Sequence, residues 1–224
     1  MINVPMKTRA AFTRQTILSI NQLTNQPTNN SSTEAVTPTK LPKLIRPTNK
    51  GQRIPLETRA TKINACLGWN VTNPDCDVDV SAFLLDSTGK VIGDTWFVFY
   101  GQTESPDHST VFRIGDGKDR EIISVDFTKI HPNVSKLVFV LTINDALEKK
   151  LNFSMLKDAY IRIMDATTNT EIVSFMMDEY YENVTSMMIG ELYLHNGSWK
   201  FHAIGNGVAR DLASLCEFYG VQVE

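Results

Sequence analysis

From about residue 50 the chain alternates short apolar segments with turn sequences, the pattern of a β-rich domain. The clearest strand is Lys136–Ile143, a continuous apolar run of the kind that forms fully buried strands. The segments on either side of Asn196-Gly197 are expected to form a hairpin, because this dipeptide favours a tight turn. The other expected strands are Gln52–Leu56, Thr61–Gly68, Val78–Asp86, Asp94–Tyr100, Ile122–Phe127, Tyr160–Met164, Glu171–Met176, Ser186–Leu194 and Trp199–Ile204.

Two helices are expected among the strands. A short one runs from Asp145, in a capping position, through Lys150. Near the C-terminus apolar residues recur at helical spacing, and Gly220 follows at the place where a helix ends. This stripe consists of Val208, Leu212, Leu215, Cys216 and Tyr219. Many strands with two helices predict a mainly β fold, a two-sheet β-sandwich with a short internal helix and a C-terminal helix.

The N-terminal quarter of the chain has a different composition. Residues 1–49 are polar and punctuated by proline, and are expected to form a basic, low-complexity tail and linker before a sandwich domain at 50–224. Residues 1–53 carry eight Lys and Arg against one acid, a net charge of +7, whereas the remainder carries 14 bases and 24 acids, a net charge of −10. An acidic body suits a cation-binding protein and is a poor composition for gripping nucleic acid.

The cysteines indicate the cellular compartment, and the lack of known catalytic motifs limits the reactions that the protein could catalyse. The three cysteines are an odd number without a C-x-x-C pair, which favours a reducing compartment, and we expect the cytoplasm. The sequence contains no run of about 18 apolar residues, so we expect no membrane span. The four histidines lack zinc-site spacing, and no nucleophile elbow or phosphate-binding loop occurs, so the sequence offers few candidates for catalysis. Cys76 lies between two acids, which should raise the pKa of its thiol.

Three acids lead into an apolar strand. In an extended chain Asp75, Asp77 and Asp79 project from one face, with neighbours about 6.5–7 Å apart. The alternate residues, from Val78 onward, are expected to enter the core. Clustered carboxylates repel one another, and a hard cation such as Ca²⁺ is the simplest compensation, although acids that merely face water explain the pattern equally well. An EF-hand is excluded because Val80 replaces its turn glycine.

Two further groups supply candidate oxygen ligands. The loop Gly115–Glu121 can turn tightly and aim its acids at one point, or can be a polar hairpin loop in which its own Lys118 and Arg120 neutralise them. The acids of this loop are Asp116, Asp119 and Glu121. The pair Asn144-Asp145 follows the buried strand, where rigid scaffolds place ligands, although Asp145 has the helix cap as its alternative role. Asn70 is a further possible donor, or a turn asparagine.

Taken together, these segments resemble the tellurium-resistance, TerD-type stress proteins. The resemblance covers residues from about 50 to the end, in order and at similar spacing. The matching residues include Lys50-Gly51-Gln52, Leu67-Gly68-Trp69, Asp77–Leu85, Phe97–Tyr100, Leu137–Val140, Asn144-Asp145-Ala146, Asn152-Phe153, Ala159–Ile163, Gly190–Tyr193 and Trp199–Gly205.

The resemblance implies a β-sandwich, Ca²⁺ binding and a role in tellurite resistance and other stress responses, without catalysis. The implied ligands are Asp77, Asp79, Asp116, Asp119, Glu121 and Asp145, with Asn144 beside them. The chain departs from the family pattern, because its acidic loop is shortened and Asn70 and Asn144 replace an acid and a histidine. Fewer anionic oxygens imply weaker Ca²⁺ binding, or the loss of a site.

One alternative keeps the fold and loses the site. In that case the protein is a metal-free protein-interaction module with a degenerate Ca²⁺ site, in which Lys118 or Arg120 pairs with the acids. A small-ligand binder is a third possibility, and the sequence shows no glycine-rich phosphate cradle to support it. The partners expected from the sequence are therefore a calcium ion or other proteins.

Overall fold

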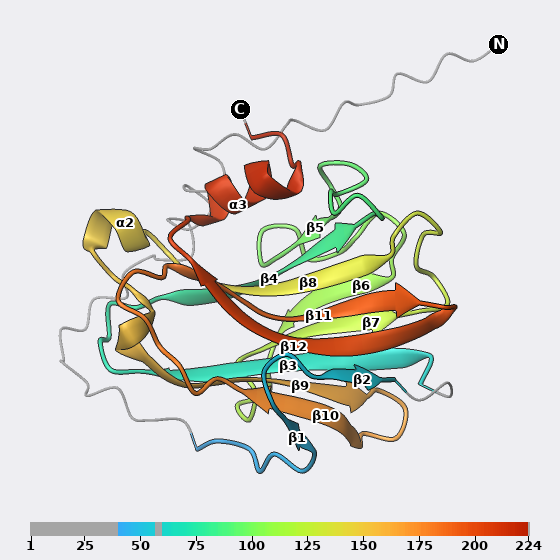
Figure 1. Ribbon diagram of the computed structural model, residues 1–224, viewed down its shortest axis with the longest axis horizontal. Helices are drawn as coiled ribbons and strands as arrows, with labels where there is room; N and C mark the ends of the chain where they lie inside the picture. Colours follow the sequence, from blue (N-terminus) through green and yellow to red (C-terminus); the bar gives the residue numbers. More distant parts are fainter. Residues whose placement is uncertain (1–39, 57–59, 224) are drawn as a thin grey trace.

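The computed structural model describes residues 40–56 and 60–223 of the 224-residue chain. Within these residues the strands form two six-stranded sheets packed face to face, which confirms the expected β-sandwich (Figure 1). Residues 1–39, most of the expected tail, lie outside the described residues.

The first sheet is antiparallel except at one edge, where β1 pairs parallel to β10. Its strands are joined in register by pairs such as Cys66 opposite Arg162 and Cys66 opposite Ile122. In spatial order it contains β1 (Pro47–Thr48), β10 (Glu171–Met176), β9 (Leu156–Asp165), β3 (Lys62–Val71), β7 (Glu121–Asp126) and β6 (Thr110–Ile114).

The second sheet is antiparallel throughout its described pairs and has Ser186–His195 and Lys136–Ile143 as its two central strands. In spatial order it contains β2 (Arg53–Pro55), β12 (Ser198–Val208), β11 (Ser186–His195), β8 (Lys136–Ile143), β4 (Val78–Leu85) and β5 (Phe97–Val98).

The main core lies between the sheets and is built by the alternation of each strand. On β4, Val78, Val80, Ala82 and Leu84 join this core, as the sequence predicts. The intervening residues of β4 face the other side of the second sheet, where a second apolar cluster lies. Asp79 is therefore the first residue of this second face of β4. The apolar cluster covers the same face further along the strand, so the face is not exposed to water along its whole length.

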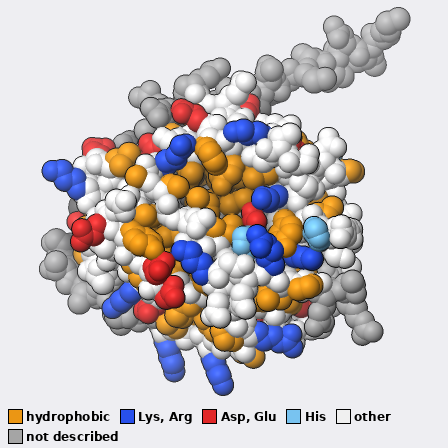
Figure 2. All heavy atoms as spheres, viewed as in Figure 1, with side chains coloured by type: hydrophobic (Ala, Val, Ile, Leu, Met, Phe, Trp, Pro, Cys, Tyr) orange, Lys and Arg blue, Asp and Glu red, His pale blue; other side chains and the backbone are white. Residues whose placement is uncertain are grey.

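The C-terminal helix α3 (Leu212–Tyr219) forms that cover (Figure 1). Its buried residues pack on the outer face of β4, β5 and β8 through Phe83, Phe97 and Val140. Asp211 caps the helix by accepting a hydrogen bond from the Ser214 N–H at 2.8 Å, and Gly220 ends it with φ 87°. Figure 2 shows hydrophobic side chains gathered at the centre of the same face of the molecule.

The strand predictions fail at three places. The segment expected as a long strand at 94–100 is a strand only at Phe97–Val98, because Phe99 and Gln102 bond to each other across a turn. β6 was not expected, since it is short, lies at the sheet edge and exposes Ile114. β1 also escaped the sequence analysis, because only two residues pair.

The short internal helix α2 (Ala146–Lys149) lies where the sequence predicts it. Asp145 occupies the N-cap position, but its side chain accepts no capping hydrogen bond, so the expected capping role is wrong. Its backbone has a φ of 51°, in the left-handed region, and this turns the chain out of β8. A 3-10 helix, η1 (Phe153–Met155), follows before β9.

Candidate metal site

The first part of the site is the entry into β4. Cys76 and Val78 are buried, whereas Asp75 and Asp77 are exposed, so the expected alternation already holds before the strand begins. Asp79 is the second residue of β4 and pairs with Thr142 of β8. Beyond the strand end, the Asn144 N–H donates to the Asp77 carbonyl at 2.8 Å. This pairing brings the Asp-rich entry of β4 next to the Asn144-Asp145 turn, as the sequence predicts.

Glu121 approaches the same place from the opposite sheet. It is the first residue of β7, it is buried, and its Oε2 accepts a hydrogen bond from the Val80 N–H at 2.7 Å. β5 pairs with β4 only at Ala82 and Phe83, so the Val80 N–H has no strand partner on that side. The Glu121 carboxylate takes the place of the missing strand, and this fixes one carboxylate across the sandwich from Asp79.

The two carboxylates most deeply placed in the site have strongly altered acidity. Burial raises the pKa of Asp79 to about 7, and the nearby charge of Asp77 adds to the shift. Burial raises the pKa of Glu121 to about 8; Asp79 and Asp77 also raise it, against the opposing Val80 N–H and Arg120. Holding both carboxylates ionised therefore costs free energy unless a cation joins them.

Tyr100 is a member of the site that the sequence analysis missed. Its hydroxyl is buried and has no hydrogen-bond partner in the part of the chain that the structure describes. Burial raises the pKa of this phenol, and the next contributions come from Asp79, Asp77, Asp145 and Glu121. The hydroxyl therefore lies within the electrostatic reach of all four acids. The aromatic segment at 97–100 is visible in the sequence, but the turn that brings Tyr100 to the acids is not.

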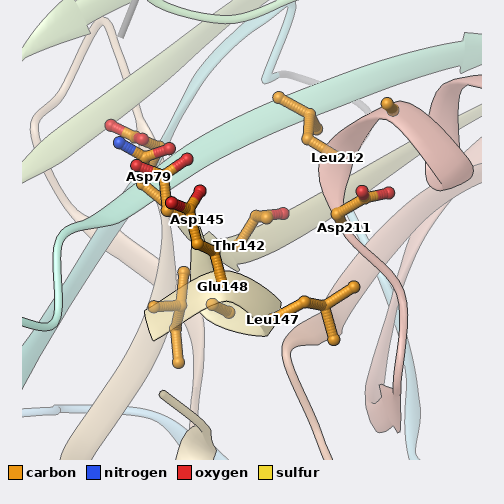
Figure 3. Close-up of a pocket in the computed structure, with 11 residues that line it drawn as sticks. Asp79, Thr142, Asp145, Leu147, Glu148, Asp211 and Leu212 are labelled. Atoms are coloured by element: carbon orange, nitrogen blue, oxygen red, sulfur yellow. The ribbon is translucent and has the colours of Figure 1, made fainter. Parts of the chain in front are cut away.

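A cavity opens beside these acids. Its volume is about 180 Å³, and Figure 3 shows Asp79 and Asp145 on one side of it and Asp211 on the other. Asn144 is buried at its wall, and Leu147 and Leu212 add apolar surface from α2 and α3. Asp145 already has one cationic neighbour, because Lys149 Nζ lies 3.3 Å from its Oδ2.

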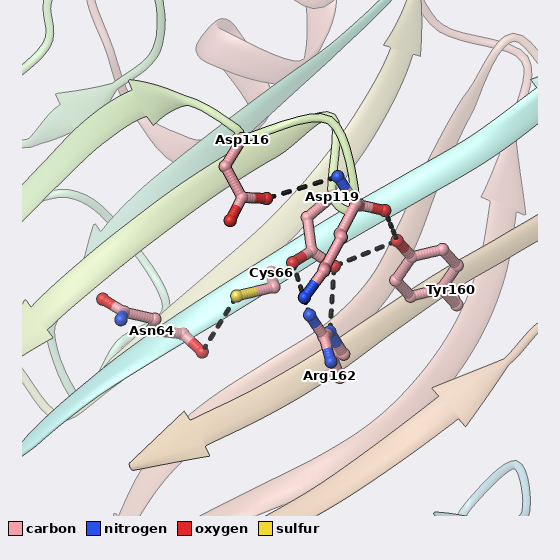
Figure 4. A network of polar contacts seen from close by, with 7 residues as sticks. Asn64, Cys66, Asp116, Asp119, Tyr160 and Arg162 are labelled. Carbon is pink, nitrogen blue, oxygen red and sulfur yellow. Dashed lines mark hydrogen bonds and ion pairs between the residues drawn. The ribbon is translucent and has the colours of Figure 1, made fainter. Parts of the chain in front are cut away.

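Two of the expected ligands lie elsewhere. Asp119 is buried, but its carboxylate accepts from Arg162 at 2.9 Å and 2.6 Å and from the Tyr160 hydroxyl at 3.0 Å (Figure 4). Asp116 is exposed, and its Oδ1 accepts from the Lys118 N–H within its own loop at 3.2 Å. Neither is a leading cause of the shifted pKa values of Asp79, Glu121 or Tyr100.

Asn70 and Arg120 also have specific partners in the structure. The Asn70 side chain is buried on β3 and donates to the Asp158 carboxylate at 3.0 Å. Arg120 donates from Nε to the Trp69 carbonyl at 2.7 Å and lies over the Trp69 ring, 5.4 Å from its centroid. Arg120 is thus close enough to lower the pKa of Glu121, but less strongly than burial raises it.

The donor chemistry of the site fits a hard divalent cation. The charges of Asp77, Asp79, Glu121 and Asp145 all act on the buried, unpartnered hydroxyl of Tyr100, and carboxylate oxygens are the ligands that Ca²⁺ prefers. No three His, Cys, Asp or Glu side chains in the described ranges are already arranged to hold a metal ion. The carboxylates would therefore have to draw together around an ion.

Comparison with known proteins identifies the fold family. Residues 47–219 match the TerD domain. This chain belongs to the TerD domain family. The tellurium resistance protein TerD of Serratia marcescens is 38% identical over 184 residues, which cover 77% of this chain and 96% of that protein. General stress protein 16U of Bacillus subtilis is 36% identical over 187 residues, 78% of this chain and 96% of the relative.

A solved structure shares the fold of this TerD domain. The crystal structure of a homologue of telluride resistance protein (TerD) from Streptomyces coelicolor A3(2) superimposes with a TM-score of 0.55 at 13% identity. The match covers 72% of this chain and 99% of that one. Within the described ranges, no helix of this TerD domain is long and apolar enough to cross a membrane.

Proposed function

We propose that this protein acts in a stress response, as the names of its tellurium-resistance and general-stress relatives indicate, by binding Ca²⁺ at one end of the sandwich. The ligands would be the carboxylates of Asp77, Asp79, Glu121 and Asp145, with the Asn144 amide beside them. We further propose that it catalyses no reaction and works in the cytoplasm, in keeping with its three free, buried cysteines.

The observation that carries the proposal is the pair Asp79 and Glu121. These carboxylates come from different sheets; Glu121 is buried and Asp79 is half-buried, and desolvation raises the pKa of both. A bound Ca²⁺ supplies two positive charges to the carboxylates and no redox chemistry. The chain's own residues do the rest, because Val80 orients Glu121 and the β4–β8 pairing holds the Asp77 and Asn144 backbones together.

The consequence is structural rather than catalytic. Asp79 belongs to β4, Glu121 to β7, and Asp145 to the turn between β8 and α2. A cation held by all three would link the two sheets to the loop that precedes α2. Binding to the folded state alone stabilises it by about 2.7 kcal/mol when the ligand is at one hundred times its Kd.

One set of contacts favours a second candidate function, a metal-free protein-interaction module. Asp119 is paired with Arg162, and Asp145 with Lys149, so two expected ligands already have cations within the described residues. An interaction module would use the same end of the sandwich without an ion. The metal content of protein purified without chelator separates the two candidates.

The test is the melting temperature with and without Ca²⁺. We expect a rise of about 5–10 °C at saturating Ca²⁺, from a stabilisation of about 2.7 kcal/mol in a domain of this size. The double variant Asp77→Asn/Asp79→Asn should lose the rise. Glu104→Gln removes an exposed acid whose one ion pair among the described residues is with His108, and this variant should keep the rise. Equal melting temperatures with chelator and with millimolar Ca²⁺ would rule out the Ca²⁺ site.

A further inference from the structure

A second charged region lies on the outer face of the first sheet, away from the acids. Ile161 and Ile163 of β9 enter the core, so Arg162 between them faces outward. There it borders a cavity of about 430 Å³. The lining residues are Lys40, Leu41, Pro42, Lys43, Gly117, Lys118 and Arg162.

The cations around this cavity outnumber the acids. A small neighbouring cavity shares Lys40 and Lys118 and adds Arg120 to its wall. Among the described residues that line the two cavities, five are Lys or Arg and none is Asp or Glu. Lys40 and Lys43 come from the basic residues 1–53, and Lys118, Arg120 and Arg162 come from the remainder, whose net charge is −10. Like charges held together repel, and an anion is the simplest compensation.

The guanidinium of Arg162 is oriented by Asp119 and keeps one donor nitrogen free of hydrogen bonds within the described residues. Asp119 accepts from its Nε at 2.9 Å and from its Nη2 at 2.6 Å, which fixes the plane of the guanidinium (Figure 4). Its Nη1 makes no hydrogen bond within the described chain and remains a donor at the cavity wall. The arginine is therefore oriented by one carboxylate and can still donate to a second anion.

Contacts of the Lys118 carbonyl and N–H fix the position of this residue in its loop. The Tyr160 hydroxyl lies 3.0 Å from both the Lys118 carbonyl and Asp119 Oδ1 and shares its one proton between them, and Asp116 accepts from the Lys118 N–H at 3.2 Å. Gly117 has a φ of +92°, a conformation that L side chains rarely adopt. These two backbone contacts and the Gly117 conformation set the shape of the loop, and the exposed Lys118 ammonium makes no ion pair in the described residues.

The opposite wall is anchored as well. Glu171 Oε1 accepts from the Ile45 N–H at 2.8 Å and from the Arg46 N–H at 2.7 Å. This fixes the chain two residues after Lys43. The ammonium groups of Lys40 and Lys43 have no carboxylate partner among the described residues.

We propose that this cavity binds a multiply charged oxyanion, either a free inorganic ion or the phosphate group of a small phosphomonoester. Arg162 is balanced by Asp119, whereas Lys40, Lys43 and Lys118 contribute three positive charges without an ion pair among the described residues, which suits a doubly charged tetrahedral anion. The volume leaves room for a small organic group beside the phosphate. The site shares no residue with the proposed Ca²⁺ site, so the two can be tested separately.

The experiment is a calorimetric titration of the full chain with inorganic phosphate, and separately with glycerol 3-phosphate, at low ionic strength. Saturable binding is expected and should weaken as salt is added, because the cations are partly exposed. Lys43→Gln and Lys118→Gln should each weaken binding about tenfold, the size of one lost charge-assisted hydrogen bond. Lys129→Gln removes an exposed lysine that lines neither cavity and should leave the affinity unchanged.

The relative affinities for the two probes distinguish a free oxyanion from a phosphomonoester. Phosphate binding at least as tightly as glycerol 3-phosphate identifies the ligand as a free oxyanion, and tighter binding of the ester identifies a phosphomonoester. The proposal is overturned if neither probe binds saturably at millimolar concentration, or if Lys129→Gln weakens binding as much as the two cavity variants do. The Asp77→Asn/Asp79→Asn variant should bind phosphate normally.

Discussion

Glu121 closes the unpaired edge of β4 by accepting a hydrogen bond from the Val80 N–H at 2.7 Å. The Glu121 carboxylate thus accepts the hydrogen bond that a neighbouring strand would otherwise accept, and it also belongs to the acids of the candidate metal site. These two roles respond differently to substitution, because the hydrogen bond needs only an oxygen whereas ion binding needs the charge.

Glu121→Gln should separate the two roles. Its amide oxygen can still accept from the Val80 N–H, and it removes a buried charge, so the chelator-treated variant at pH 8 should be at least as stable as the unchanged protein. Its Ca²⁺ response should be lost. Glu121→Ala leaves the buried Val80 N–H unpaired and should cost about 1–3 kcal/mol in urea denaturation. Equal destabilisation by Gln and Ala would contradict this.

The stability of the Ca²⁺-free protein should fall as the pH rises. The pKa values of Asp79 and Glu121, about 7 and about 8, lie above those of the unfolded chain, so the folded state binds these protons more tightly. The stabilisation is fully present below the unfolded pKa values near 4 and is lost as the pH passes through 7 and 8. Urea denaturation in chelator from pH 5 to pH 8.5 measures it, and Asp79→Asn with Glu121→Gln should flatten the curve. A parallel curve in the double variant would refute the assignment.

Asp119 should matter for folding and not for the ion. Asp119→Ala leaves the half-buried Arg162 without its carboxylate and should cost about 1–3 kcal/mol. In a variant folded enough to titrate, such as Asp119→Asn, the Ca²⁺ midpoint should stay unchanged. Asp116→Asn, at an exposed residue, should change neither stability nor Ca²⁺ response. A Ca²⁺ response abolished by either Asn variant would return the loop to the site.

The three cysteines should be unreactive until the protein unfolds. Burial raises the pKa of the Cys66 thiol to about 12, and the thiols of Cys76 and Cys216 also have raised pKa values, chiefly because they are buried. Thiolates carry the reactivity, so an exchangeable disulfide reagent at neutral pH should label native protein slowly and urea-unfolded protein at all three sites. Rapid labelling of native Cys76 would show that the entry to β4 opens readily.

The sequence predicted the sandwich well because its signals are local. Lys136–Ile143 is a strand with the expected bounds, and Asn196-Gly197 is the turn between β11 and β12. Gly220 ends α3 as expected. Each of these features depends on periodicity or turn chemistry within a few residues.

The candidate site was only partly predictable because it depends on contacts between distant segments. The pairing of β4 with β8 brings Asp79 and Asp145 together, which two strand ends could suggest. Asp119 and Glu121 are two residues apart, yet one faces Arg162 outside and the other faces Val80 inside. Strand alternation cannot apply across them, because β7 begins only at Glu121. Tyr100 enters through a turn at the end of β5 that the sequence reads as strand.

The most direct test of the central claim is calorimetric titration of Ca²⁺ into the chelator-treated full chain at pH 7.5, in two buffers with different ionisation enthalpies. We predict saturable binding, with proton release because Asp79 and Glu121 are partly protonated at this pH, and loss of the heat in Asp77→Asn/Asp79→Asn. No saturable heat at millimolar Ca²⁺, or the same isotherm in the double variant, would contradict the account.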